Sequence, residues 1–341
     1  MKEYKETITI LTLNGYTNYG NRLQLFALSR TLARLSIRTK TYWRKKPIFI
    51  AKSYIKRFPI IRKKFLKEQK LRDFSKKYTP REVSKLSRRT VVGSDQVWNV
   101  KHLDKRQYLL NMQPVEKQRF SYAASVSVAE LKSDEKQVFK DALRNYSLIS
   151  VREQSAKDLL QPLTDKKIEV VLDPTLLLMA EEYEQLEKKP KGLAENERYI
   201  LCYILGNRDH EEKIEKFAKE KGYKTIYFSD KCDSDYGVEE FLYLIHHAQL
   251  ICTDSFHACV FSFIFERPFV AFKRTGEANY MYTRLQNLID TFELKNREFN
   301  GKEITKENLE VNYTEAKKIL KKEQKKSLDF LKRALDIKDE N

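Results

Sequence analysis

Two series of short β-rich runs, alternating with stretches of helical periodicity, constrain the fold of this chain most strongly. In the first series the strand-like runs are residues 7–13, 37–43, 90–94, 120–128, 148–151 and 168–172; in the second they are 199–205, 224–228, 250–253 and 269–272. Helix-period stretches lie between them, at 21–35, 211–221, 237–247 and 256–265. This alternation favours parallel sheets with helices on both faces.

A polar stretch separates the two series. Residues 188–197 read KKPKGLAENE, which is typical of a linker. A chain of 341 residues is also too long for one ordinary hydrophobic core. We therefore expect an α/β fold of two doubly wound, Rossmann-like domains facing a cleft: residues 1–190 with a basic helical insertion at about 44–89, residues 191–300, and a helical tail at 301–341 that packs back across a domain.

Composition narrows the class of protein. The N-terminus has no apolar signal-peptide core, and no window approaches the roughly 18 apolar residues of a membrane span. The four cysteines, at 202, 232, 252 and 259, form no CxxC pair, so a disulfide or a zinc site built on cysteines is not expected. These features predict a cytoplasmic protein without a metal ion or other cofactor.

Most of the positive charge belongs to one segment. Residues 44–89 hold 18 Lys or Arg against 3 acids, an excess of 15 out of the net +18 of the chain. Within it, residues 47–78 mix aromatic and aliphatic side chains with dense Lys and Arg, as does a helix lying on an anionic membrane. A solvated helical face over a small core is the alternative. Nucleic-acid binding is not expected, because no nucleic-acid motif accompanies the charge.

Polar clusters follow five of the expected strands. They are NGYTNYGNRLQ (14–24), GSDQVWN (93–99), SVREQSA (150–156), DPT (173–175) and TDSFHA (253–258). In an open parallel sheet, ligands bind outside the carboxyl ends of the strands and near helix N-termini. The sequence therefore predicts that these loops meet in one cleft.

His257 is the sharpest single candidate, because it follows Asp254 and Ser255 at the start of an apolar helix. An imidazole there can bind a phosphate or carboxylate, or donate a proton near neutral pH. The alternative is that Asp254 or Ser255 only caps the helix and His257 is a half-buried structural residue. His246 and His247, at the end of another helix, look like surface residues or partners of its C-terminal dipole.

Three other loops have two interpretations each. Arg152 suits a carboxylate or phosphate ligand, or else forms a structural ion pair with Glu153 or Asp173. In GSDQVWN, Trp98 stacks on a sugar while Asp95, Gln96 and Asn99 bind its hydroxyls, or Trp98 is buried and Asp95 caps a helix. Lys273 and Arg274 either neutralise an anionic donor or are solvated.

Motifs of several enzyme classes are missing. The sequence has no Walker lysine motif, GxGxxG, HExxH or GxSxG. Asp233-Ser234-Asp235 lies in a polar loop and is a weak match to the DxD of metal-dependent nucleotide-sugar enzymes. A metal-dependent mechanism is therefore not supported by motif.

Taken together, the segments resemble the polysaccharide pyruvyl transferase family. The matching text is GYTNYGNRLQLFAL, VVGSDQVWN, FSYAASV, ISVREQSA, VLDPTLLL, YILG, ICTDSFHACVFSFIFERPFVAF and MYTRLQNLIDTF, in the family's order over about residues 8–292. The resemblance implies a GT-B-like fold. It also implies transfer of the pyruvyl group of phosphoenolpyruvate to a sugar of a surface polysaccharide, or of its lipid-linked precursor, to form a ketal.

The resemblance also implies roles for residues. His257, helped by Asp254, is expected to be catalytic, and Arg152, Ser255, Lys273 and Arg274 to bind the donor in the C-terminal domain. The acceptor side is expected to use Asn18, Tyr19, Gly20, Asn21, Asp95, Gln96, Trp98 and Asn99. Where relatives usually read TDSFHGT, this chain has Ala258 and Cys259, which removes a glycine near the expected phosphate position.

Two rival functions stay open on the sequence. One is a GT-B glycosyltransferase that uses a nucleotide sugar, and the other is a catalytically silent member that binds glycan or an assembly partner. A lipid-linked acceptor would fit peripheral contact of residues 47–78 with the inner face of the cell membrane.

Overall fold

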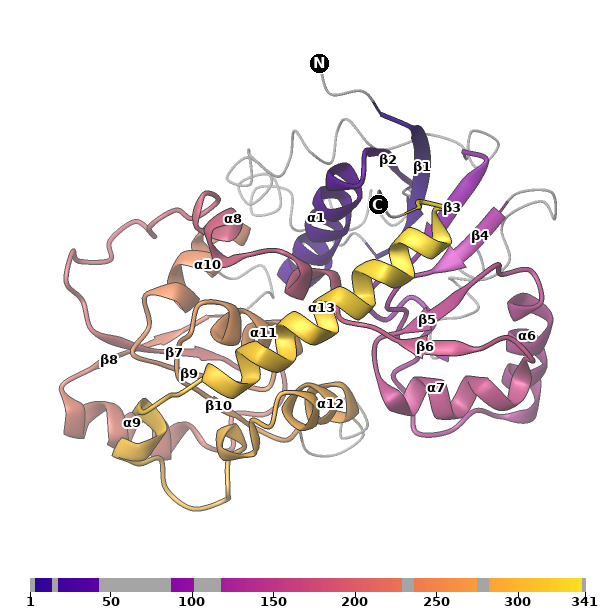
Figure 1. Ribbon diagram of the computed structural model, residues 1–341. Helices are drawn as coiled ribbons and strands as arrows, with labels where there is room; N and C mark the ends of the chain where they lie inside the picture. Colours follow the sequence, from indigo (N-terminus) through magenta and orange to yellow (C-terminus); the bar gives the residue numbers. More distant parts are fainter. Residues whose placement is uncertain are drawn as a thin grey trace, which may run out of the picture.

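Two parallel β-sheets, each covered by helices, form the two halves of the protein (Figure 1). The computed structural model describes residues 4–13, 18–42, 87–100, 118–228, 236–274 and 282–338. The basic segment lies outside these residues up to position 86, as do Gly15 and Asp233–Asp235, so the expected membrane contact of residues 47–78 stays a prediction. The expected α/β fold of two Rossmann-like halves is confirmed.

The N-terminal sheet has the strand order β2-β1-β3-β4, all parallel. Its strands are β1 (Glu6–Leu11), β2 (Ile37–Tyr42), β3 (Arg89–Val92) and β4 (Gln118–Ser121). A two-stranded parallel sheet, β5 (Ile149–Val151) and β6 (Ile168–Val170), continues it, because Ser121 N donates to Leu148 O at 3.1 Å and Ala124 bridges Val151. Helices α6 (Ser133–Leu143), α7 (Gln154–Leu160) and α8 (Ala180–Glu184) and the 3-10 turns η3 (Gln161–Leu163) and η4 (Pro174–Leu177) complete this half.

The C-terminal sheet has the order β10-β9-β7-β8, again all parallel. Its strands are β7 (Tyr199–Tyr203), β8 (Lys224–Tyr227), β9 (Leu250–Thr253) and β10 (Phe269–Ala271). The helices are α9 (Glu211–Lys221), α10 (Val238–His246), α11 (Phe256–Ile264) and α12 (Thr283–Thr291), followed by the 3-10 turns η6 (Lys295–Arg297) and η7 (Lys306–Leu309).

Both sheets therefore have the same topology, in which the first strand lies between the second and the third. The order reverses between β1 and β3 in one half and between β7 and β9 in the other. Ligand crevices of open α/β sheets lie at such a switch point, outside the carboxyl ends of the strands. The loops after β1, β3, β7 and β9 are thus where a site is expected.

Helix α1 (Tyr19–Arg34) links the two halves. Its N-cap is Asn18, whose side chain accepts from Asn21 N at 2.9 Å. Tyr19, in the first turn, is 1% exposed and stacks on Phe228 and Phe241 of the C-terminal half, with ring centroids 5.3 and 5.1 Å apart. One hydrophobic cluster consequently runs through both halves.

The C-terminal helix α13 (Thr314–Ala334) crosses from the C-terminal half to the N-terminal half (Figure 1). Near its middle, the hydroxyl of Ser327 accepts from Leu172 N at 3.0 Å, and past its end Leu335 O accepts from Arg89 at 3.0 Å. The last residues thus pack back across the other half, as the sequence predicted. Among the helices described, none is long and apolar enough to span a membrane.

One strand is shorter than expected. Residues 120–128 were predicted to be extended, but β4 ends at Ser121. Ala123 and Ser127 have φ values of 49° and 54°, a left-handed conformation that interrupts pairing. Past this interruption, Ala124 still bridges Asp95 on one side and Val151 on the other.

Candidate functional site

The loops after the four switch-point strands line one cavity between the two halves. Its volume is about 70 Å³. The N-terminal half contributes Asn18, Gly20, Asp95 and Gln96, the C-terminal half contributes Tyr203, Leu205, Phe241, Ser255, Phe256, His257 and Arg274, and α12 adds Arg284. Of these twelve residues, eleven (all but Phe241) were chosen from the sequence or stand in its quoted motifs, and they come from segments more than 200 positions apart.

His257 lies in the first turn of α11, two residues after the N-cap Ser255. Its ring is packed against the start of α1: a Cβ built on Gly20 would lie 2.0 Å from His257 Nδ1. On the other side, Nε2 is 3.7 Å from an Asp173 carboxylate oxygen and is buried without a hydrogen-bond partner among the described residues. Packing therefore holds the imidazole in place. It lies where the start of α1, from the N-terminal half, meets the start of α11, from the C-terminal half.

Asp173, rather than Asp254, is the carboxylate beside His257. Its Oδ1 accepts from the backbone and hydroxyl of Thr175 at 3.0 and 2.7 Å, and its Oδ2 accepts from Ser94 at 3.1 Å and from Arg152 at 2.7 Å. Burial opposes ionisation, but the nearby imidazole of His257 and the hydrogen-bonded guanidinium of Arg152 hold the pKa of Asp173 well below its usual range. Asp173 therefore remains a carboxylate at neutral pH.

Arg152 is buried between carboxylates. It donates to Asp173 and, at 3.2 Å, to Asp95, its Nε is 3.7 Å from Glu153, and its guanidinium lies 4.4 Å from the Phe256 ring centroid. Burial lowers the pKa of Arg152, but the carboxylates of Asp95, Asp173 and Glu153 raise it by a larger amount. The pKa of Arg152 is therefore above its normal value. The structural ion pair that the sequence left open for Arg152 is present, and the donor-binding role stays a prediction.

Asp95 interacts with two buried cations, Arg152 of the N-terminal half and Arg284 of α12. Its φ of 67° is in the left-handed region, and it follows Gly93, where a Cβ would lie 2.1 Å from Tyr122 O. Burial raises the pKa of Asp95, but Arg152, His257 and Arg284 lower it to a value below normal. The amide of Asn21 donates to its Oδ2, so Asp95 is a hub of the site and not the helix cap considered for it.

Asp254 holds a different cation. Its two oxygens accept from the backbone N–H groups of Leu205 and Gly206, both at 2.8 Å, and from Arg274 Nε at 2.9 Å. The side chain of Asp254 thus fixes Arg274 at the cavity wall and connects β7 to β9. The expectation that Asp254 orients His257 is corrected by this geometry.

Arg284 completes the positive wall. It is 7% exposed, lies 3.6 Å from Asp95, and Gln96 accepts from its two terminal nitrogens at 3.0 and 2.9 Å when the amide oxygen faces them. Burial and the nearby Arg152 lower the pKa of Arg284 to about 10. It is therefore still a cation at neutral pH.

Two aromatic candidates for the acceptor side are core residues instead. Trp98 is 0% exposed and packs edge-on against Phe139 and Tyr146, so the stacking interpretation is wrong and the alternative of a buried tryptophan holds. Tyr19 is covered by the C-terminal aromatic rings, and its hydroxyl donates to Tyr236 O at 2.9 Å. Neither ring faces the cavity.

The other polar candidates divide between the cavity and its surroundings. Asn18 and Gln96 line it, while Asn21 and Asn99 lie behind it, with the side-chain amide of Asn99 2.9 Å from that of Gln96. Lys273 is mostly exposed, lies 3.7 Å from Glu298 and does not line the cavity. Of the two neighbouring cations, the structure therefore brings only Arg274 to the site.

Sequence reasoning passed over two residues. Arg284 stood inside the quoted segment MYTRLQNLIDTF without a role, although an arginine on the apolar side of a helix is a signal of a buried charge. Asp173 was considered only as a partner of Arg152. Its position beside His257 depends on the packing of η4 against α11, which no local pattern shows.

Comparisons with known proteins name a family for this chain. Structurally the chain is similar to UDP-GlcNAc 2-epimerase from Methanocaldococcus jannaschii (13% identity, TM-score 0.49, covering 93% of this chain and 92% of that one). It is also similar to MurG of Acinetobacter baumannii (9% identity, TM-score 0.38, covering 96% and 99%). No curated protein matches. The family described as polysaccharide pyruvyl transferase matches residues 18–275, which contain the loops after β3, β7 and β9 and the start of α1, and the chain therefore belongs to the polysaccharide pyruvyl transferase family.

Proposed function

We propose that this protein transfers the pyruvyl group of phosphoenolpyruvate to a sugar of a surface polysaccharide, or of its lipid-linked precursor, and closes a ketal. One observation carries the proposal: His257, Arg274 and Arg284 line a single cavity at the N-terminus of α11. Phosphoenolpyruvate has a carboxylate and a phosphate, so it needs several cations and free N–H groups in one place.

The cavity offers those groups in fixed positions. Asp254 anchors Arg274, and Gln96 with Asp95 anchors Arg284, so both guanidinium groups are oriented before a ligand arrives. The first N–H groups of α11 point the positive end of the helix dipole at the same place, and Ser255 makes no side-chain cap bond to them. We assign the donor to this wall, and Arg152 to holding Asp95 and Asp173.

In the proposed reaction His257 protonates the methylene carbon of phosphoenolpyruvate. The central carbon then carries positive charge and is attacked by one sugar hydroxyl, which loses its proton. The proton of the first hydroxyl returns to His257, and phosphate leaves with the electron pair of the C–O bond. A second hydroxyl of the sugar then attacks the same carbon, gives its proton to the released phosphate and closes the ketal. Asp173 supports this role, since a carboxylate 3.7 Å from Nε2 stabilises the protonated imidazole.

The acceptor would enter from the N-terminal half. Asn18 and Gln96 face the cavity there, and Asn21 connects the start of α1 to Asp95. Amides suit sugar hydroxyls, because they both donate and accept hydrogen bonds without adding charge. This places donor and acceptor on opposite walls, with His257 between them.

A ligand screen tests the donor assignment. Thermal unfolding is measured with phosphoenolpyruvate, UDP-GlcNAc and a CMP-sugar, and we expect stabilisation by phosphoenolpyruvate only. Arg274→Gln and Arg284→Gln should each weaken that binding by about 10-fold or more, because a hydrogen bond to a charged group is lost. Lys216→Gln, on the exposed surface of α9, serves as the control.

Two outcomes would contradict the assignment. Stabilisation by a nucleotide sugar instead of phosphoenolpyruvate would favour the glycosyltransferase alternative. No stabilisation by any of the three donors would favour a catalytically silent member that binds glycan.

A further inference from the structure

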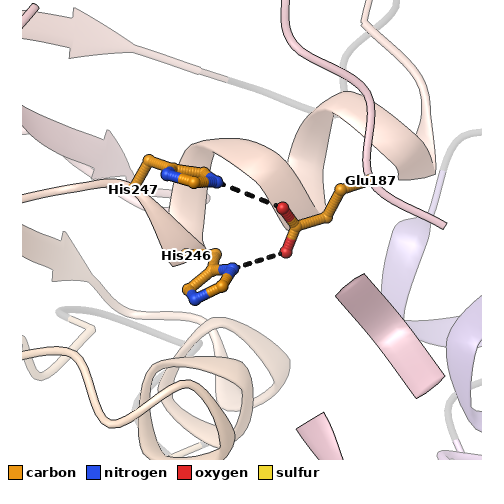
Figure 2. Close-up of side chains that lie close together, drawn as sticks. All are labelled: Glu187, His246 and His247. Carbon is orange, nitrogen blue, oxygen red and sulfur yellow. Dashed lines mark hydrogen bonds and ion pairs between the residues drawn. The ribbon is translucent and has the colours of Figure 1, made fainter. Parts of the chain in front are cut away.

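Glu187, His246 and His247 form a cluster of possible metal ligands outside the cavity (Figure 2). The two oxygens of the Glu187 carboxylate face one imidazole each, with Oε1 2.8 Å from His246 Nδ1 and Oε2 3.2 Å from His247 Nε2. One ligand atom from each residue can be chosen so that all lie within 4.8 Å of one another. None of the three residues lines the cavity that holds His257.

The two imidazole rings are held in place by neighbouring aromatic rings. His246 stacks on Phe265, with centroids 4.5 Å apart and planes at 13°, and His247 stacks on Tyr243, with centroids 4.1 Å apart and planes at 28°. The side chain of Glu187 is only 10% exposed, and Lys188 N donates to Glu239 O at 3.2 Å, which ties this segment to α10. The ligand set is therefore pre-organised by packing.

The spacing fits a small divalent cation. Zn²⁺ binds nitrogen and carboxylate oxygen at about 2.0–2.2 Å, which puts tetrahedral ligands about 3.4 Å apart. The separations of 2.8 and 3.2 Å involve different carboxylate oxygens, and one ligand atom from each residue lies within 4.8 Å of the others, so binding needs side-chain shifts of up to about 1.4 Å. His247 is 43% exposed, so the cluster also has an entry path and room for a water as the fourth ligand.

We propose that Glu187, His246 and His247 bind one Zn²⁺ ion. Two imidazoles and one carboxylate suit this borderline-soft metal better than Mg²⁺ or Ca²⁺, which prefer oxygen ligands only. Binding replaces the hydrogen bonds between the glutamate and the histidines and releases any proton on the two ligating nitrogens.

The ion would fasten the connection between the two halves. Residues 185–198 run from α8 to β7 without a helix or strand, and Glu187 lies near the start of this connection. His246 and His247 lie at the C-terminal end of α10, so one Zn²⁺ would join the connection to the C-terminal half. Its effect is on stability, and the proposal is independent of the donor that the protein uses.

Tag-free protein is stripped with a chelator and titrated with Zn²⁺ by calorimetry, and bound metal is counted after gel filtration. We expect one equivalent per chain and a higher midpoint of thermal unfolding, because a ligand that binds only the folded state stabilises it. Glu187→Gln and the His246→Ala, His247→Ala double variant should each weaken binding by about 100-fold or more, since loss of an outer-shell partner alone costs about 10–100-fold.

Glu184→Gln, an exposed glutamate at the end of α8, and His210→Gln, at the N-cap of α9, are the matched controls and should bind like the parent. Co²⁺ provides a second readout, because a tetrahedral site with imidazole ligands gives it visible absorption bands that a surface ion lacks. The proposal is overturned if the parent binds no stoichiometric Zn²⁺, or if the cluster variants bind it as tightly as the controls. Either result would leave the cluster as a glutamate that pairs with two histidines.

Discussion

Gly20 and His257 are in such close contact that no other residue fits at position 20 without moving the imidazole. A Cβ on Gly20 would lie 2.0 Å from Nδ1 and 2.5 Å from Cγ of His257. Gly20 belongs to the N-terminal half and His257 to the C-terminal half. The glycine in the first turn of α1 therefore sets the position of the histidine at the centre of the site.

Gly20→Ala should destabilise the protein by about 1–3 kcal/mol, because the extra methyl overpacks the contact with His257. The free energy of unfolding is measured by denaturant titration. If the contact is the cause, the cost of Gly20→Ala should be much smaller in a His257→Ala background, where the ring is absent. Equal costs in both backgrounds would place the effect in the helix backbone instead.

Asp173→Asn should cost about 3–5 kcal/mol at pH 7, because it removes a buried carboxylate and leaves Arg152 with one fewer partner. The pKa of Asp173 is well below its usual range in the folded protein and near 3.9 in the unfolded chain. Its stabilisation is therefore complete above about pH 5 and is lost as the pH falls toward the folded pKa.

The difference in unfolding free energy between the parent and Asp173→Asn should consequently shrink as the pH is lowered from 5 to 3. Asp165→Asn, an exposed aspartate, is the control and should show a small difference throughout. A difference for Asp173→Asn that does not change with pH would show that its charge does not stabilise the fold.

Tyr19→Ala should cost about 3–5 kcal/mol, as does truncation of other buried aromatic residues, because the ring joins the two halves. Tyr19→Phe should cost only about 1 kcal/mol, the value of its hydrogen bond to Tyr236 O. Both are read from denaturant unfolding. If Tyr19→Ala left stability unchanged but weakened glycan binding, the original acceptor assignment of this tyrosine would be right.

Asn21→Ala should raise the KM for the acceptor more than the KM for phosphoenolpyruvate, because the lost amide positions Asp95 on the acceptor side. Initial rates are measured with each substrate varied in turn. Asn99→Ala, at a residue whose side-chain amide lies 2.9 Å from that of Gln96 and which does not line the cavity, gives a comparison one residue further away. A larger change in the KM for phosphoenolpyruvate would contradict this assignment, because it would place the donor on the side of Asn21.

Local pattern sufficed for the sheets and for the loops of the site. Short apolar runs predict the parallel strands, and the polar residues after β3 and β9 mark the carboxyl ends of these strands. Asp95 and His257 could therefore be predicted from the sequence. Contacts between side chains could not be predicted in the same way. Trp98 is buried by Phe139 and Tyr146, and Asp173 reaches His257 across the two halves, and both contacts depend on tertiary packing between distant segments.

The same limit explains the cluster of Glu187 with His246 and His247. The two histidines are adjacent in the sequence and were interpreted as surface residues or as partners of the C-terminal dipole of their helix. Glu187 comes from the connection between the halves and reaches them only when that connection packs on α10. Sequence spacing cannot reveal a ligand set that is completed by tertiary contact.

Release of phosphate from phosphoenolpyruvate tests the central claim most directly. The parent and His257→Ala are incubated with phosphoenolpyruvate and surface glycan extracted from the source organism, and phosphate is followed over time. Circular dichroism and thermal unfolding confirm that the variant is folded. The account predicts glycan-dependent phosphate release by the parent and none by His257→Ala. Unchanged turnover in His257→Ala would remove this histidine from the reaction and contradict the account.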